Sequence, residues 1–214
     1  MKRKYILVIT ALSMGLYFGF PTVTANSVIA EAATLPAPAP EPTVLVEEPV
    51  AEKEVHYKEG LAAYITTVND TVPREKAMTI AESMLEQAEK HHIDETLLLA
   101  IAHTESTYYS DAVSCMGYKG LMQTGDVLAE EAGYSPDDLF DPEVSIAVGA
   151  DYISDQLACF DQDMELALTA YNQGPGAVYA GDYSTGYAEV TLERMAGIED
   201  FLSEEGYLPE DCIQ

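Results

Sequence analysis

The chain has 214 residues, which is enough for one domain of ordinary size with a core of its own. It holds 37 acidic residues against 10 lysines and arginines, so its formal net charge is −27. Binding to phosphate backbones requires clustered basic residues, so nucleic acid is excluded as an expected partner. Binding to anionic wall polymers by bulk charge is excluded for the same reason.

The first 30 residues have the layout of a secretory signal peptide. Basic residues at positions 2–4 precede an uncharged apolar run over 5–20, and small residues follow. The alternative is a single uncleaved N-terminal anchor, although the apolar run is somewhat short for a full membrane span. We therefore expect an exported protein that is secreted or held at the cell envelope.

Residues 31–55 are rich in Pro, Ala, Glu and Val. Such a composition does not bury a core, and its prolines favour an extended spacer. We therefore expect a linker over 31–55 and one globular domain over 56–214.

Apolar residues recur at helical spacing in several segments of the globular part. Thr71 is expected to start and cap the first helix, which carries apolar residues from Met78 to Ala88. Asp94 is expected to cap the second helix, which ends near Glu105. Further helices are predicted over 121–131, from Asp141-Pro142 through Leu157, from Met164 to Tyr171 with a stop at Gly174-Pro175-Gly176, and over about 188–202. No convincing alternating run is present, so the sequence predicts a mainly α domain with short connections.

The three cysteines, Cys115, Cys159 and Cys212, form an odd set for an exported chain. One disulfide with one free thiol is compatible with this set, as is none, and the pairing stays open. No metal or other cofactor is expected, because the histidines at 91–92 and His103 lack ligand spacing with a cysteine or a carboxylate pair. These histidines are expected to face solvent or to cap helices.

Glu105 is the candidate catalytic residue. It shares one helix face with Leu98 and Ile101, so it ends an apolar stripe. A carboxyl group in such a place is partly desolvated, which raises its pKa and suits it to donate a proton near neutral pH. Taken alone, an exposed helix-end glutamate or one paired with a lysine is the more common outcome.

Two further features lie later in the chain. Tyr171 shares a helix face with Met164 and Leu168, where a tyrosine ring usually packs and its hydroxyl finds a partner. Gly120 and the turn at 174–176 are permissive backbone positions. They either let a polymeric ligand approach the backbone closely or simply allow the chain to turn in a loop.

Three blocks in this order carry a resemblance to a known family. They are Glu105-Ser106, then Gly120-Leu121-Met122-Gln123, then Ala170-Tyr171-Asn172-Gln173-Gly174-Pro175-Gly176-Ala177-Val178. Together they resemble the soluble lytic transglycosylase (SLT) domain, a relative of goose-type lysozyme, over about Val72 to Met195. The resemblance implies a mainly α, lysozyme-like fold.

The activity implied by the resemblance is cleavage of the β-1,4 bond between N-acetylmuramic acid and N-acetylglucosamine in the glycan strands of peptidoglycan. Glu105 would protonate the glycosidic oxygen and then act as base on the muramoyl C6 hydroxyl, which forms a 1,6-anhydro end without water. A second protein carboxylate is not required, in contrast to the usual two-carboxylate glycosidase.

The resemblance also implies roles for the other site residues. Ser106 would orient Glu105 or touch substrate, and Tyr171 would hydrogen-bond near Glu105 or the reacting sugar. Met122 and Gln123 would line the sugar cleft. Asn172 would fix the local backbone, and Tyr187 would form a wall of the cleft.

The chain departs from the family pattern at three places. Cys115 stands where proline is frequent, and Ser145 stands where asparagine is common. Thr124-Gly125-Asp126 replaces the usual apolar-then-proline continuation after the glutamine. These departures concern the loop geometry and the outer subsites, and they leave Glu105 intact.

Two alternatives remain open. One is a true lysozyme that hydrolyses the same bond with water, which a second carboxylate positioned to activate water would favour. The other is a non-catalytic glycan-binding or assembly protein of the same fold. The expected role of a monomeric enzyme is wall turnover, or opening of the wall for a secretion or conjugation apparatus.

Overall fold

The computed structural model describes residues 50–208, with side chains from Lys53 onward. The expected signal peptide, residues 31–49 of the expected linker and Cys212 lie outside the described residues. The described segments are α1 (Val50–Val68), α2 (Arg74–His91), α3 (Glu95–Glu105), α4 (Asp126–Glu131), the 3-10 helix η1 (Pro136–Phe140), α5 (Pro142–Cys159), α6 (Met164–Gln173), α7 (Pro175–Ala180) and α8 (Gly186–Glu204). Between residues 50 and 208 there is no β-strand, only isolated bridges that pair Lys119 with Val113 and with Thr124. The prediction of a mainly α domain is confirmed.

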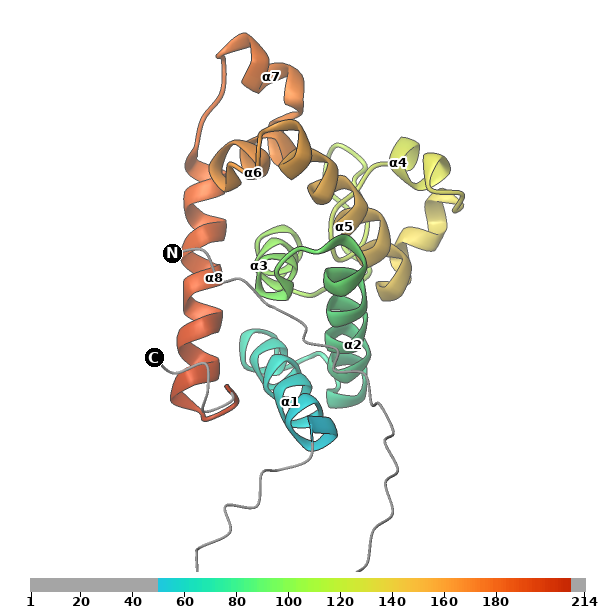
Figure 1. Ribbon diagram of the computed structural model, residues 1–214. Helices are drawn as coiled ribbons and strands as arrows, with labels where there is room; N and C mark the ends of the chain where they lie inside the picture. The colour runs from blue at the N-terminus through green and yellow to red at the C-terminus, as the bar shows by residue number, and fades with distance from the viewer. Residues whose placement is uncertain (1–49, 209–214) are drawn as a thin grey trace, which may run out of the picture. The chain divides into compact units, whose positions relative to one another are not determined.

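Helix α3 lies in the middle of the helical domain, with α1, α2, α5, α6 and α8 around it (Figure 1). Asp94 caps its start, because the Asp94 carboxylate accepts a hydrogen bond of 2.9 Å from the backbone N–H of Thr96. All residues from Thr96 to Ala102 are buried, so the helix is apolar on every side rather than amphipathic. The first partly exposed residues after this buried run are at the end of the helix, where Glu105 lies.

Helix α1 begins at Val50, inside the range expected for the linker. Its alanines and glutamates suit a helix as well as a spacer. Leu61, Ala62 and Ile65 are fully buried, and α1 packs along α2. This packing against a neighbour, which composition does not reveal, makes the segment part of the domain.

The start of α2 differs from the prediction. The helix begins at Arg74 after Pro73, and no side chain caps it. The Thr71 hydroxyl instead donates a 2.6 Å hydrogen bond to the Asn69 side chain. Thr71 therefore belongs to the turn before the helix.

The helix predicted over 121–131 covers only Asp126–Glu131 in the structure. Gly120 and Gln123 both have left-handed backbones, with φ of 75° and 48°. The backbone N–H of Lys119 also donates to the carbonyl of Thr124 at 3.0 Å. Residues 120–124 therefore form a tight turn, because a left-handed residue interrupts a right-handed helix.

Histidines 91–92 lie at the end of α2, and His92 is its left-handed C-cap with φ of 55°. His103 is placed differently from the prediction. Its ring stacks on Tyr108 with a centroid separation of 5.8 Å, and its Nδ1 lies 3.1 Å from the Tyr64 hydroxyl. Burial, with a smaller effect from Arg194, lowers the pKa of His103 to about 4.

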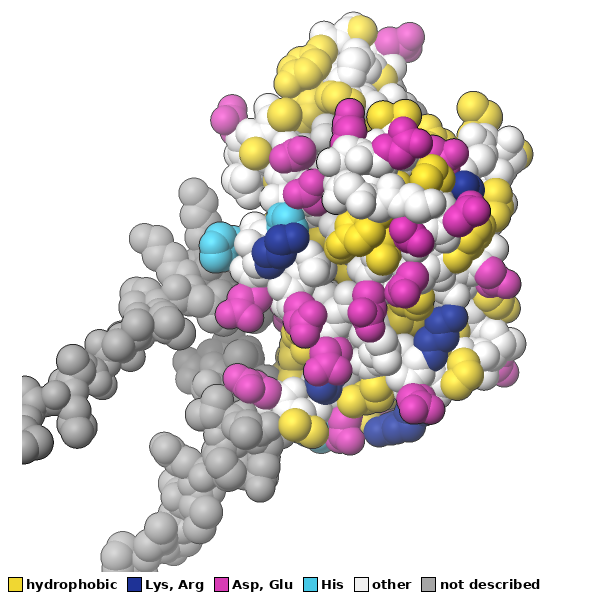
Figure 2. Space-filling model, turned by 90° about the vertical axis from the view of Figure 1, so that its right-hand side faces the viewer, with side chains coloured by type: hydrophobic (Ala, Val, Ile, Leu, Met, Phe, Trp, Pro, Cys, Tyr) yellow, Lys and Arg dark blue, Asp and Glu magenta, His cyan; other side chains and the backbone are white. Residues whose placement is uncertain are grey.

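The surface of the domain carries the excess of acidic residues. Figure 2 shows acidic side chains spread over one face, with few lysines and arginines among them and hydrophobic groups between. Within residues 50–208, none of the helices combines the length and hydropathy needed to cross a membrane.

Candidate active site

A cleft with a cavity volume of about 630 Å³ opens beside the end of α3. Its lining comes from the end of α3, the loop after it, the first turn of α4, and facing residues of α5 and α6. The lining residues are Glu105, 116–118, 123–128, Tyr152 and 171–174. Segments that are distant in the sequence therefore line one cleft together with Glu105.

Glu105 is the last residue of α3, and its carboxyl group is largely withdrawn from solvent. Burial raises the pKa of Glu105 above its ordinary value. The Tyr187 hydroxyl donates a 2.7 Å hydrogen bond to Glu105 Oε1 and opposes this rise, but burial has the larger effect. The result is a carboxylic acid that holds its proton to a higher pH than an exposed glutamate, as a general acid requires.

Tyr187 lies in the first turn of α8 and fixes one oxygen of Glu105. Burial and then the charge of Glu105 raise the pKa of Tyr187 well above its ordinary value. Its hydroxyl therefore stays protonated and serves as a hydrogen-bond donor. Tyr187 was expected to wall the cleft, but it is not among the lining residues, and its contact with the site is this hydrogen bond to Glu105.

Tyr171 is buried beside Glu105, whose charge contributes to raising the pKa of Tyr171 after burial itself. The Tyr171 hydroxyl donates to the backbone carbonyl of Met122 at 2.8 Å. Its hydrogen bond therefore ties α6 to the turn at 120–124, whereas the bond to Glu105 comes from Tyr187.

Gln123 lines the cleft, and its side chain is oriented by the turn. Its Nε2 donates to the carbonyls of Ala112 at 3.1 Å and Gly120 at 2.9 Å. Both N–H groups of the amide are thus engaged within the loop. The amide oxygen is the group of this side chain that remains to accept a hydrogen bond from a ligand in the cleft.

Met122 was expected on the cleft wall, but its side chain is fully buried. It packs over α5 at Gly149, where an added Cβ would lie 2.6 Å from the Met122 Cβ. The Met122 N–H also donates to the Ser145 hydroxyl at 3.1 Å. Met122 therefore positions the turn, and Ser145, one of the departures from the family pattern, supplies a partner for it.

Ser106 was expected to orient Glu105 or to touch substrate. It is buried as the C-cap of α3, and its hydroxyl donates to the carbonyl of Ala102 at 3.2 Å. Its contact is therefore with the backbone of the helix that carries Glu105.

Asn172 is exposed and lines the cleft. The role expected for it, fixing the local backbone, is performed by its neighbour Gln173. The Gln173 side chain donates to the carbonyl of Ser184 at 2.7 Å and accepts from the N–H of Ser184 at 3.1 Å. These two bonds join the end of α6 to the segment that leads into α8 and Tyr187.

Several residues that line the cleft were not singled out as site residues from the sequence. Tyr118, Tyr152 and Thr124 belong to this set, and Asp126 supplies a second carboxylate. The departure at 124–126 was the sequence signal for Thr124 and Asp126. Tyr118 and Tyr152 carried no such signal.

No group of three or more histidine, cysteine, aspartate or glutamate side chains in the part of the chain that the structure describes is arranged to hold a metal ion. Cys115 and Cys159 are free and exposed, so they are not paired with each other.

Residues 82–187 match the family model described as the transglycosylase SLT domain. Among curated relatives, the membrane-bound lytic murein transglycosylase F of Maricaulis maris is 34% identical over 125 residues, which cover 56% of this chain and 26% of the relative. The soluble lytic murein transglycosylase of Escherichia coli K12 is 34% identical over 94 residues, which cover 40% of this chain and 15% of the relative. The chain thus matches about a quarter or less of the length of these two relatives.

Among solved structures, the 70 kDa soluble lytic transglycosylase of Escherichia coli matches with a TM-score of 0.47 and 20% identity, covering 72% of this chain and 29% of that chain.

Proposed function

We propose that this chain, whose residues 82–187 match the transglycosylase SLT domain model, is a peptidoglycan lytic transglycosylase with Glu105 as its acid and base. The observation that carries the proposal is the state of Glu105. Its carboxyl group is among the groups that line the cleft, burial raises its pKa, and a tyrosine hydroxyl donates a hydrogen bond to one of its oxygens.

In the proposed reaction, neutral Glu105 gives its proton to the oxygen of the β-1,4 bond between N-acetylmuramic acid and N-acetylglucosamine. The C1–O bond breaks, and N-acetylglucosamine leaves as the alcohol. The muramoyl C6 hydroxyl then attacks C1 and loses its proton to the Glu105 carboxylate. The product has a 1,6-anhydro end, Glu105 is neutral again, and no water is consumed.

Two side chains of the site suit this cycle. The Tyr187 hydroxyl donates to Glu105 Oε1 and so stabilises the carboxylate that exists after the first proton transfer. The Gln123 amide oxygen is available to accept a hydrogen bond from an acetamido N–H or a sugar hydroxyl.

Hydrolysis of the same bond by water is the alternative within the enzyme class, because Asp126 places a second carboxylate in the cleft. Asp126 Oδ1 is, however, engaged by Lys119 at 3.1 Å. That oxygen already contacts the Lys119 ammonium group, so we favour the route through the C6 hydroxyl.

We further propose that the protein acts outside the cytoplasm, where its substrate lies, and that residues 1–30 direct its export. A role in wall turnover, or in opening the wall for a secretion or conjugation apparatus, is compatible with this placement.

The test is mass spectrometry of muropeptides released from purified peptidoglycan by the chain and by its Glu105→Gln variant. We expect anhydromuropeptides from the parent and none from the variant. Reducing-end products from the parent would replace the proposal with a lysozyme activity. No release by a folded parent would indicate a binding or assembly protein.

A further inference from the structure

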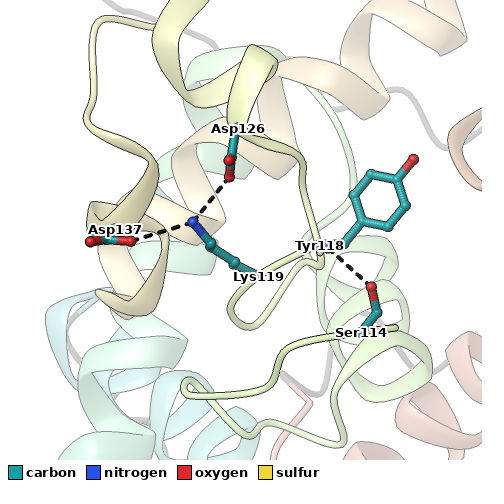
Figure 3. Close-up of polar contacts among 5 residues, drawn as sticks. All are labelled: Ser114, Tyr118, Lys119, Asp126 and Asp137. Carbon is teal, nitrogen blue, oxygen red and sulfur yellow. Dashed lines mark hydrogen bonds and ion pairs between the residues drawn. The ribbon is translucent and has the colours of Figure 1, made fainter. Parts of the chain in front are cut away.

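Lys119 lies behind the cleft wall between two carboxylates. Its Nζ is 3.1 Å from Asp126 Oδ1 and 3.3 Å from Asp137 Oδ1 (Figure 3), and its side chain is only 17% exposed. Asp126 begins α4 and lines the cleft, whereas Asp137 belongs to η1. These three residues, the Lys119 cluster, connect the loop after α3 with α4 and η1.

The backbone of Lys119 is held within the segment between α3 and α4. Its N–H donates to the carbonyl of Thr124 at 3.0 Å, and it also forms a bridge with Val113. Immediately before it, the N–H of Tyr118 donates to the Ser114 hydroxyl at 3.0 Å, and the Tyr118 carbonyl accepts from the Ser114 N–H at 2.9 Å. Residues 114–118 therefore form a closed loop that ends where Lys119 is anchored.

Tyr118 lines the cleft together with its loop neighbours Met116 and Gly117, and Gly125 makes room for the Tyr118 ring. A Cβ added at Gly125 would lie 3.2 Å from Cε1 of the Tyr118 ring, so the ring packs against the backbone there. The Tyr118 side chain remains 48% exposed. It therefore presents an aromatic surface to whatever occupies the cleft.

Three of the residues that depart from the family pattern, those at 124–126, each contact Tyr118 or Lys119. Thr124 accepts from the Lys119 N–H, Gly125 leaves room for Tyr118, and Asp126 pairs with the Lys119 ammonium group. Residues 124–126 thus contact Tyr118 and Lys119 across the turn.

We propose that Lys119 is a positioning residue that holds the cleft wall formed by Tyr118 and residues 123–126 in its ligand-binding arrangement. Without the cation, Asp126 and Asp137 would repel each other in a chain that already has a net charge of −27. Glu105 and Tyr187 lie on α3 and α8, outside the cluster. Lys119 therefore acts on ligand binding and not on the proton transfers, and the proposal relies on the proposed function only for the identity of the ligand.

The experiment measures the rate of muropeptide release by the full chain against the concentration of peptidoglycan fragments. Lys119→Ala is expected to raise the half-saturating concentration by about threefold to tenfold and to leave kcat within about twofold. Lys119→Arg, which keeps the charge, should restore most of the affinity. The control is Lys58→Ala. Lys58 also forms an ion pair, with its Nζ 3.2 Å from Glu82 Oε1, but this pair joins α1 to α2 away from the cleft.

A double-mutant cycle with Asp126→Asn tests whether the effect passes through the ion pair. The losses in Lys119→Ala and Asp126→Asn should be clearly less than additive. Unchanged half-saturation in Lys119→Ala, or a fall confined to kcat, would overturn the proposal. If Lys119→Ala does not fold, Asp137→Asn replaces it, with a smaller rise expected and the absence of a rise counting against the proposal.

Failure of the proposed function is distinguishable from failure of this inference. If the parent releases no product, co-sedimentation with insoluble peptidoglycan is compared between the parent and Lys119→Ala. Weaker retention of the variant supports the positioning role without catalysis. Equal retention, or no retention of the parent, overturns it.

Discussion

Replacing Tyr187 by phenylalanine removes one hydroxyl and keeps the ring in its place. That hydroxyl donates the 2.7 Å hydrogen bond to Glu105 Oε1, and this bond lowers the pKa of Glu105 against the larger effect of burial. Tyr187→Phe should therefore raise the pKa of Glu105 further. The neutral acid, which is the form that donates a proton to the substrate, should persist to higher pH.

The size of the effect follows from the difference between two hydrogen bonds. A bond to a charged acceptor contributes about 1.5–3 kcal/mol and one to a neutral acceptor about 0.5–1.5 kcal/mol. Their difference, about 1–1.5 kcal/mol, changes the ratio of ionised to neutral Glu105 by roughly fivefold to thirteenfold. At low substrate concentration, the alkaline decline of kcat/KM should move to higher pH, although the maximum rate falls because the carboxylate is less well fixed.

The assay is the initial rate of muropeptide release at low substrate concentration from about pH 4 to about pH 9, where kcat/KM reports the protonation of the free enzyme. Tyr179→Phe is the matched control, because Tyr179 is 71% exposed on α7 and is not among the cleft residues. An alkaline decline that stays in place, or that moves to lower pH in Tyr187→Phe, would refute the role assigned to this hydrogen bond.

Two further predictions concern stability. Tyr171→Phe leaves the buried Met122 carbonyl without its hydrogen-bond donor. The substitution should lower the free energy of unfolding, measured by urea titration, by about 1–3 kcal/mol. A loss no larger than that of Tyr179→Phe would contradict this prediction. The pKa of His103 is lowered from 6.5 to about 4 in the folded state. As the pH falls from about 6.5 to about 4, His103 therefore becomes protonated in the unfolded chain before it does in the folded one, and this lowers the free energy of unfolding. His103→Gln should remove that part of the pH dependence, and a parent-minus-variant difference in unfolding free energy that is constant from pH 7 to pH 4 would count against it.

Local signals predicted the helix that carries Glu105. Asp94 caps α3 as expected, and the apolar residues from Leu97 to Ile101 form a buried helix that ends at Glu105. Asp141 and Pro142 likewise start α5. Capping and periodicity act within a few residues, so they can be read without tertiary structure.

The hydrogen-bond partner of Glu105 depended on tertiary packing. Tyr171 and Tyr187 were both expected near the site, but no local pattern indicates which hydroxyl reaches the carboxylate. The answer depends on how α6 and α8 pack around α3, and the contact joins residues 82 positions apart. The turn at 120–124 was missed because Leu121 and Met122 look like the start of an apolar helix face, while the left-handed backbone of Gln123 leaves no clear trace in the sequence.

The double hydrogen bond between Gln173 and Ser184 has a consequence for how the domain tolerates change. It closes residues 174–183, including α7, into a loop whose two ends are held together at Gln173 and Ser184, which form its neck. Tyr171 lies just before that neck and Tyr187 just after it, so both keep their positions irrespective of what the loop contains. The loop is therefore the place where a segment can be lengthened, shortened or exchanged, with the neck isolating the carboxylate and its donor from the alteration.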